Sequence, residues 1–187
     1  ASPIIIFCKR SSSSFVSLYF PASPIARPHL TVRDAGGNSP SMVKEAFEIW
    51  KKASNGKISF EFVDNLYASQ INIEWKRVDR SSLGHCIFNF DSDSRLFSAE
   101  IQIGLSDGLI HQQYEDKNEV RHTVIHEIGH ALGLNHSPYP DDIMYVPHQY
   151  GVTSVSKRDM LTLKWLYAFP AGLTQSDILV HHKLDSA

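Results

Sequence analysis

Residues 126–136 read HEIGHALGLNH, and this stretch decides what the chain can be. Histidines four positions apart lie about 40° apart around a helix axis and one turn along it, so His126 and His130 can reach one metal ion. Gly133 can adopt a positive φ without steric cost, so it can end the helix and let His136 return as a third ligand. Three protein ligands leave a fourth tetrahedral position for water, as in a catalytic zinc site.

Glu127 completes this pattern. It follows His126 directly and is therefore swung by about 100° around the helix, which suits contact with a water molecule better than metal binding. A zinc ion and a neighbouring general base are the parts of a peptide-hydrolysing site. The alternatives are an ordinary amphipathic helix and a structural zinc, but the latter needs a fourth ligand, and no His or Cys follows at a suitable spacing.

The whole chain has the composition of a soluble globular domain. Its 187 residues are 42% hydrophobic and 20% charged, with a net charge of -2. No basic stripe points to nucleic acid, and the longest apolar run, Pro3–Cys8, is too short to cross a bilayer. We expect a Ser-rich N-terminal tail or pro-segment remnant over residues 1–23, a catalytic domain over 24–170 and a C-terminal tail over 171–187.

The two cysteines, Cys8 and Cys86, leave three alternatives open. They could form a disulfide in an oxidising compartment, or both could be thiols. In the third alternative, Cys8 is a latency thiol that binds the zinc as thiolate and displaces its water.

The residue pattern around the motif predicts an α+β fold. Alternating apolar residues predict five strands, and apolar residues at a spacing of three to four predict helices before, within and after the motif. Asp116 with Glu119, and Ser156 with Asp159, resemble capping boxes that start the second and third helices. The strands are expected around Leu30–Val32, Ile58–Phe62, Ile71–Trp75, Cys86–Phe90 and Ala99–Gly104. The first helix is expected to start at Pro40, to have a buried face through Trp50 and to end at Asn55-Gly56.

The residues after the motif support a family resemblance. Met144, within Asp142–Tyr145, resembles the Met-turn of the metzincins. Ser137 directly after the third histidine, and the helix over Ser156–Phe169, narrow the resemblance to the matrixins, the matrix metalloproteinases. It covers roughly Pro28–Phe169. It implies a metzincin-like twisted mixed five-stranded sheet with a backing helix, an active-site helix and a C-terminal helix.

The resemblance also implies residue roles. One catalytic zinc would be held by His126, His130 and His136, with Glu127 as the catalytic base and Met144 as the floor beneath the metal. An extended protein or peptide substrate would pair with the strand that contains Gly84 and His85. An apolar residue would be preferred after the cleaved bond, in a pocket whose wall is formed by Tyr145, Pro147 and Tyr150.

Several positions depart from the matrixin pattern. His85 matches one ligand of the structural zinc of matrixins, but Gln102 stands where another is expected, so we predict that this second zinc is absent. Arg158 replaces the first aspartate of a pair in the last helix, so the ion pair of that aspartate with a processed N-terminus should be missing. Calcium is a further candidate cofactor, through Asp91, Asp93 and Asp107, although such residues also simply form turns.

Two other histidines are expected to be peripheral. We expect His122 to be a partly exposed helical residue; the alternative is that it lies beside the metal ligands. His148 lies near the expected pocket wall, where it could contact substrate. By resemblance, the protein would be a secreted, monomeric protease of the extracellular matrix. Two rival interpretations are a non-catalytic zinc-binding module and a latent form in which residues 1–23 block the cleft.

Overall fold

The computed structural model describes residues 29–35, 40–76, 83–90, 96–104 and 117–168. Its centre is one five-stranded sheet in the order β2-β1-β3-β5-β4. Strands β1, β2, β3 and β5 are parallel, whereas β4 pairs with β5 in the antiparallel direction and lies at the edge. The mixed sheet confirms the predicted one, and the strands are β1 His29–Asp34, β2 Ser59–Phe62, β3 Ile71–Lys76, β4 Gly84–Phe90 and β5 Leu96–Gly104.

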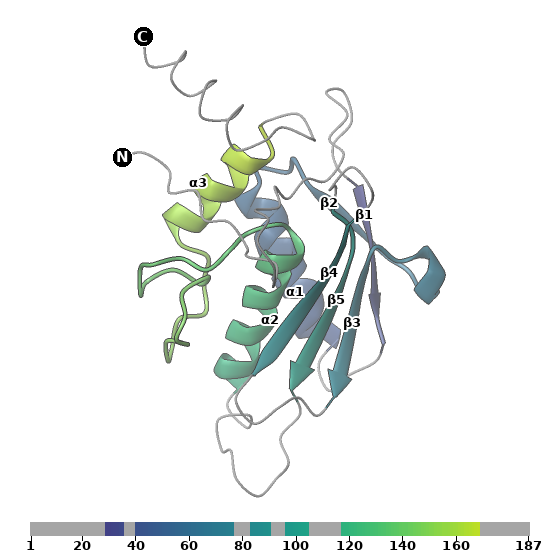
Figure 1. Cartoon of the computed structure of the whole chain (residues 1–187), viewed down its shortest axis with the longest axis horizontal. Helices are drawn as coiled ribbons and strands as arrows, with labels where there is room; N and C mark the ends of the chain where they lie inside the picture. Colours follow the sequence, from purple (N-terminus) through teal and green to yellow (C-terminus); the bar gives the residue numbers. More distant parts are fainter. Residues whose placement is uncertain (1–28, 36–39, 77–82, 91–95, 105–116, 169–187) are drawn as a thin grey trace, which may run out of the picture.

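Three α-helices accompany the sheet, which confirms the α+β class. Helices α1 (Pro40–Ala53) and α2 (Lys117–Ala131) lie side by side along one face of the sheet, and α3 (Lys157–Leu166) lies near one end of them (Figure 1). The chain order is therefore strand, helix, strands, motif helix and final helix, as expected. A short 3-10 helix, Leu66–Ala68, was not predicted.

The apolar pattern of α1 builds the core between the helices and the sheet. Its buried residues, at the predicted spacing of three to four, are Val43, Ala46, Phe47, Trp50 and Ala53. Opposite them, alternate residues of the central strands are fully buried, among them Ile71, Ile73, Ile101 and Ile103. Full burial of one such side chain contributes about 1.5–3 kcal/mol, so this contact is the main source of stability for the layer on which α2 rests.

Helix α2 is buried on more of its surface than the predicted single stripe. Val124 and Ile128 are buried as expected and Val120 is partly buried, but every other residue from 122 to 129 is buried as well. The reason is that α2 lies between α1, strands β4 and β5, and the chain that follows it. The expected box residue Asp116 lies outside the described residues, and the Glu119 carboxylate accepts a hydrogen bond from the Gly151 N–H.

Helix α3 begins as predicted and ends earlier. The Ser156 side chain accepts from the Asp159 N–H, and the Asp159 carboxylate accepts from the Ser156 N–H, which confirms the capping box. The helix ends at Leu166 rather than Phe169, with Tyr167 as its C-cap. The Tyr167 hydroxyl donates to the Leu132 carbonyl oxygen at 3.2 Å, so α3 is tied to the end of the motif helix.

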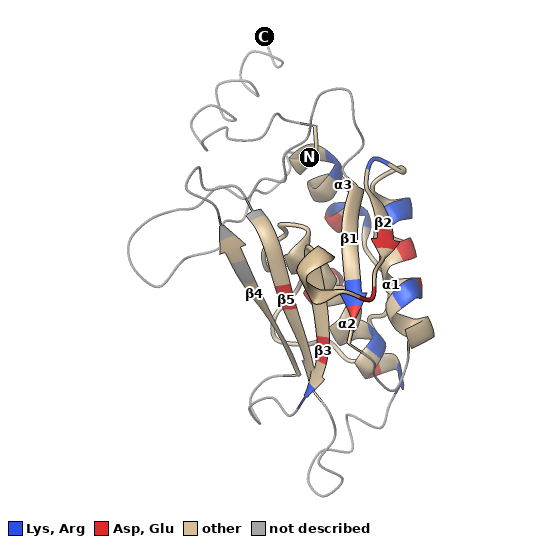
Figure 2. Ribbon diagram, turned by 90° about the vertical axis from the view of Figure 1, so that its right-hand side faces the viewer, with Lys and Arg blue, Asp and Glu red and all other residues tan. Residues whose placement is uncertain are grey.

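Charge is distributed unevenly over these elements. Figure 2 shows lysine, arginine and acidic residues along α1 and strands β1 and β2, and few on β5. The edge strand, Gly84–Phe90, contains no Lys, Arg, Asp or Glu at all. None of the described helices combines the length and the apolar character that crossing a bilayer requires.

Candidate metal centre and active site

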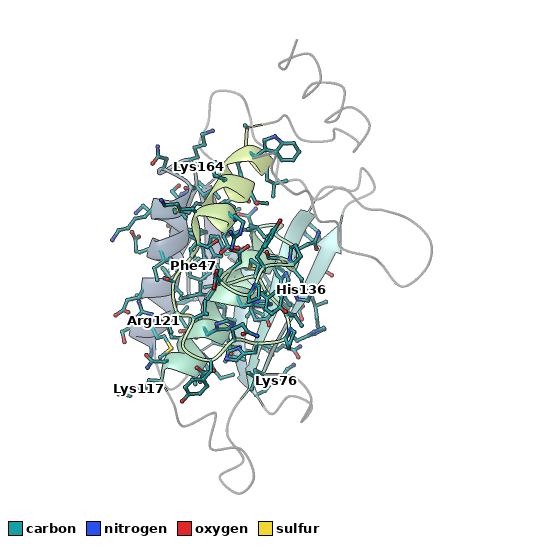
Figure 3. All side chains as sticks on the ribbon, turned by 90° about the vertical axis from the view of Figure 1, so that its left-hand side faces the viewer. Phe47, Lys76, Lys117, Arg121, His136 and Lys164 are labelled. Carbon is teal, nitrogen blue, oxygen red and sulfur yellow. The ribbon has the colours of Figure 1, made fainter. Side chains whose placement is uncertain are left out.

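The three motif histidines come together as predicted. One ring nitrogen each of His126, His130 and His136 lies within 4.8 Å of the other two. In the part of the chain that the structure describes, no other group of three His, Cys, Asp or Glu residues meets this criterion. Figure 3 shows the face of the molecule on which His136 lies, beside the motif helix.

Gly133 produces the turn that brings the third histidine back. Its φ is +95°, which is the left-handed region in which glycine is favoured. The Gly133 N–H donates to the His130 carbonyl, and the Leu134 N–H donates to the Gly129 carbonyl. The helix therefore ends within one turn of its second histidine, and His136 folds back toward it.

Backbone carbonyls orient two of the three rings. His126 Nδ1 lies 2.7 Å from the Ile143 carbonyl oxygen, and His130 Nδ1 lies 2.8 Å from that of Leu134. A carbonyl can only accept, so each Nδ1 carries the proton and each Nε2 keeps a lone pair for a metal.

The separation of the ring nitrogens also suits zinc. The Nε2 atoms of His130 and His136 are 3.1 Å apart. Two nitrogens bound to one tetrahedral zinc at its usual bond length would be about 3.3 Å apart. The three nitrogen donors, and the spacing of this pair, therefore fit a zinc ion with three histidine ligands.

Burial keeps these histidines uncharged. It is the largest cause that lowers the pKa of His126 well below its usual value and that of His130 to about 4. Burial also lowers the pKa of His136, which is the most exposed of the three. All three rings are thus neutral at pH 7, the form that binds metals.

Glu127 lies buried between the motif helix and the edge strand. Only 6% of its surface is exposed, and burial raises its pKa to about 8. A Cβ atom placed on Gly84 would lie 2.8 Å from Glu127 Oε1. The edge strand can come this close to the carboxylate only because residue 84 is a glycine and has no side chain. A bound dication nearby would favour the charged, basic form of Glu127.

Met144 lies in the core beneath the histidine motif. It is 1% exposed and packs against Gly129, which precedes the second histidine of the motif. The Ser137 N–H donates to the Met144 carbonyl oxygen at 2.8 Å, so the loop after His136 closes on itself.

The residues expected in the pocket wall have different surroundings. Tyr145 is partly buried, whereas Pro147, after a cis peptide bond, is exposed and Tyr150 is 73% exposed. His148 turns toward the motif helix and contacts the Glu119 carboxylate.

The expectation for His122 was wrong, because this ring is 2% exposed. Its Nδ1 lies 2.5 Å from the Val152 carbonyl oxygen, and its centroid lies 3.9 Å from that of His148 and 5.9 Å from that of His126. Burial is the largest cause of the lowered pKa of His122. Sequence reasoning missed this cluster, although the 3-4 spacing of Glu119, His122 and His126 places them on one helix face.

The remaining predicted site residues do not belong to the cluster of three histidines, and some lie outside the described residues. His85 is exposed, stands directly opposite Gln102 across β4 and β5, and is close enough to His130 to contribute to the lowered pKa of that ring. The absence of a structural zinc stays a prediction. Cys86 is partly buried against the core. The candidate latency thiol Cys8 and the candidate calcium ligands Asp91, Asp93 and Asp107 lie outside the described residues.

Arg158 has a partner within the chain. Its guanidinium binds the carboxylate of Asp142, which is 1% exposed and precedes Met144 by two residues. The N-terminal residues lie outside the described part, so the ion pair with a processed N-terminus is not addressed by the structure.

Comparisons with known proteins agree with this geometry. The matrixin family profile matches residues 33–168. The chain is 32% identical over 136 residues to a candidate matrix metalloproteinase of Invertebrate iridescent virus 3, which covers 66% of the chain and 36% of that protein. It is 32% identical over 119 residues to another of Heliothis virescens ascovirus 3e, which covers 54% of the chain and 24% of that protein. The chain thus spans a quarter to about a third of the length of these relatives.

The fold also has a solved counterpart. The structure of myroilysin aligns with a TM-score of 0.50 and 17% identity, over 81% of this chain and 96% of that one. The family match extends from the first strand to the end of α3 and contains all three histidines, the glutamate and the Met-turn. This chain belongs to the matrixin family.

Proposed function

We propose that this domain is the catalytic unit of a zinc-dependent endopeptidase. The observation that carries the proposal is the convergence of three neutral histidines, two with Nδ1 tied to a carbonyl, beside a buried glutamate. His126, His130 and His136 would hold the zinc. When bound, zinc supplies Lewis-acid chemistry: it lowers the pKa of a water ligand toward about 7 and stabilises negative charge on a carbonyl oxygen.

Glu127 is proposed to carry the proton. As a carboxylate it takes a proton from the attacking water, and as a carboxylic acid it passes that proton to the leaving amine. Its burial supports this role, because a raised pKa makes the carboxylate a stronger base and lets it hold the proton between the two transfers.

The edge strand β4 is proposed to bind the substrate in an extended form. Among the described strands, β4 has a neighbour on one side, β5. Exposed edges are commonly protected by charged side chains, and β4 has none. An incoming peptide could therefore add to the sheet through main-chain hydrogen bonds, with Gly84 and His85 at the end nearest to Glu127.

The preference for an apolar residue after the cleaved bond also remains a proposal. Tyr145 and the exposed residues Val146 and Pro147 support an apolar wall. By resemblance to matrixins we also propose that the protein is a secreted monomer acting in the extracellular matrix. Secretion would be checked by its recovery from culture medium.

A library of peptides tests the reaction. Wild-type protein should cleave it, with apolar residues after the cut, and a chelator should abolish cleavage. Glu127→Ala should bind zinc and lose at least about 10²-fold of the rate, whereas Glu48→Ala, an exposed change on α1, should keep it. Full activity of zinc-loaded Glu127→Ala would refute the assigned base.

The non-catalytic zinc module remains the rival function. It predicts zinc binding without cleavage in the wild-type protein and in a form without residues 1–23. Cleavage that appears after removal of residues 1–23 would instead identify a latent protease.

A further inference from the structure

Two adjacent residues of α3 contact the loop between the third histidine and the Met-turn. Arg158 Nε lies 3.0 Å from both carboxylate oxygens of Asp142, and its Nη2 lies 2.9 Å from Oδ1. The Arg158 side chain is 48% exposed, whereas that of Asp142 is 2% exposed. The guanidinium carbon also lies 4.4 Å from the centre of the Tyr139 ring, within the range of a cation–π contact.

Asp142 in turn holds the residue next to the third metal ligand. The Ser137 hydroxyl donates to Asp142 Oδ2 at 2.5 Å, and Ser137 directly follows His136. The Ser137 N–H donates to the Met144 carbonyl. Arg158 is therefore linked to the segment of His136 through one carboxylate and one hydroxyl.

The neighbouring Asp159 reaches the first metal ligand by a parallel route. Its Oδ2 accepts from the Ile143 N–H at 3.0 Å, and the Ile143 carbonyl accepts from His126 Nδ1 at 2.7 Å. Thus the first turn of α3 holds two neighbouring residues of the same short loop, Asp142 and Ile143, and each contact leads to a histidine of the proposed zinc site.

The positive charge of Arg158 compensates the negative charge of the buried Asp142 carboxylate. Burial alone would raise the pKa of this carboxyl group, but hydrogen bonds from Arg158, Ser137 and Ser156 outweigh it, and the pKa is lowered. A buried carboxylate that loses its cation is left uncompensated, and the surrounding loop must rearrange to hydrate it. Such a shift would move Ser137 and the ring of His136 with it.

We propose that Arg158 is a positioning residue for the metal site: by pairing with Asp142 it holds the loop that presents His136 and orients His126, although it touches neither metal nor substrate. The proposal rests on the proposed zinc-dependent function. Mutation of a residue that orients a metal ligand without binding the metal typically weakens metal affinity by about 10–100-fold.

Zinc affinity of the full 187-residue chain, measured by competition with a chelating dye, tests this role. Arg158→Gln should bind zinc about 10-fold more weakly. Arg158→Lys should recover part of the loss, because it keeps the charge but lacks the planar fork. Lys157→Gln is the matched control: it removes the same charge from an exposed neighbouring position and should leave affinity unchanged.

The absorption spectrum of cobalt(II) bound in place of zinc separates the two possible roles of Arg158. If Arg158 only stabilised the fold, its replacement would leave this spectrum unchanged. Arg158→Gln should change the visible absorption of bound cobalt, which reports ligand geometry. If Arg158→Gln lowers the melting temperature of the metal-free protein and leaves zinc affinity and the cobalt spectrum unchanged, the proposal is wrong.

Ser137→Ala keeps the test decisive if Arg158→Gln fails to fold. It removes the hydrogen bond from the Ser137 hydroxyl to Asp142 and should weaken zinc binding about fivefold, which corresponds to the free energy of one net hydrogen bond. Unchanged zinc affinity would overturn the proposal. Failure of the wild-type chain to bind zinc would instead overturn the proposed function.

Discussion

Gly129 and Met144 fit together so closely that position 129 has no room for a side chain. A Cβ atom on Gly129 would lie 2.4 Å from the Met144 sulfur and 2.8 Å from a ring carbon of Trp50. Trp50 is fixed in turn, because its Nε1 donates to the Ile125 carbonyl at 2.9 Å. The glycine between Glu127 and His130 thus lets α1 and the Met-turn approach the helix directly behind the metal ligands.

Gly129→Ala should therefore destabilise the protein. At an exposed helix position this change raises the free energy of unfolding by about 1 kcal/mol, whereas overpacking of a filled core lowers it by about 1–3 kcal/mol. Because the added carbon would lie only 2.4 Å from the Met144 sulfur, the steric cost should exceed the gain in helix propensity. Urea unfolding would measure the loss of stability. Met144→Ala in the same chain should relieve part of the clash. Equal stability of Gly129→Ala and wild type would contradict this packing.

Gly84→Ala should reduce catalysis more than metal binding. The new Cβ would lie 2.7 Å from Thr123 Cγ2 and 2.8 Å from Glu127 Cγ and Oε1, so the carboxylate must move. A displacement of about 1 Å at a reacting group can cost roughly 10²-fold in rate. We expect kcat/KM to fall by that order while zinc content stays at the wild-type level.

Thr123→Ser is the matched compensating change for Gly84→Ala, because it removes Cγ2 and keeps the hydroxyl that donates to the Glu119 carbonyl. The double variant should recover part of the activity. Unchanged activity of Gly84→Ala alone would show that the carboxylate is placed differently.

Glu119→Ala should loosen the segment after the Met-turn. The buried carboxylate contacts His148 Nε2 and accepts from the Gly151 N–H, so it fastens this segment to α2. Its loss should raise KM for peptides by roughly tenfold, the equivalent of one charge-assisted hydrogen bond, and speed limited proteolysis near residue 150. Glu100→Ala, an exposed change on β5, should do neither, and an unaltered KM of Glu119→Ala would exclude a role in the cleft.

The ion pair of Asp142 should make part of the stability dependent on pH. Its pKa is lowered below 3.8: burial raises it, but the hydrogen bonds from Arg158 and Ser137 prevail. For a carboxyl group with a depressed folded pKa, the stabilisation is fully present above the unfolded pKa and is lost as pH falls through the folded one. The difference in unfolding free energy between wild type and Asp142→Asn should be constant from pH 7 to about 5 and shrink below pH 3.8. A difference that does not vary across this range would rule out the ionic contribution.

Local sequence was sufficient for most of the metal centre. The spacing of His126 and His130, the glycine that turns the chain at position 133, and the capping box of Ser156 with Asp159 all depend on contacts within one or two helical turns. Alternation and helical periodicity likewise predicted the strands and helices, because backbone geometry repeats every two or 3.6 residues.

Tertiary structure decided which distant residues support that centre. His148 lies 29 positions from Glu119, and Arg158 lies 16 from Asp142. His122 is buried because a later segment folds over it, which its own helix could not indicate. The order of the strands, with the uncharged β4 at the edge beside Glu127, is also a product of the whole fold. Such contacts follow no short repeat: they are selected by how complete elements pack, so they emerge when the layers assemble.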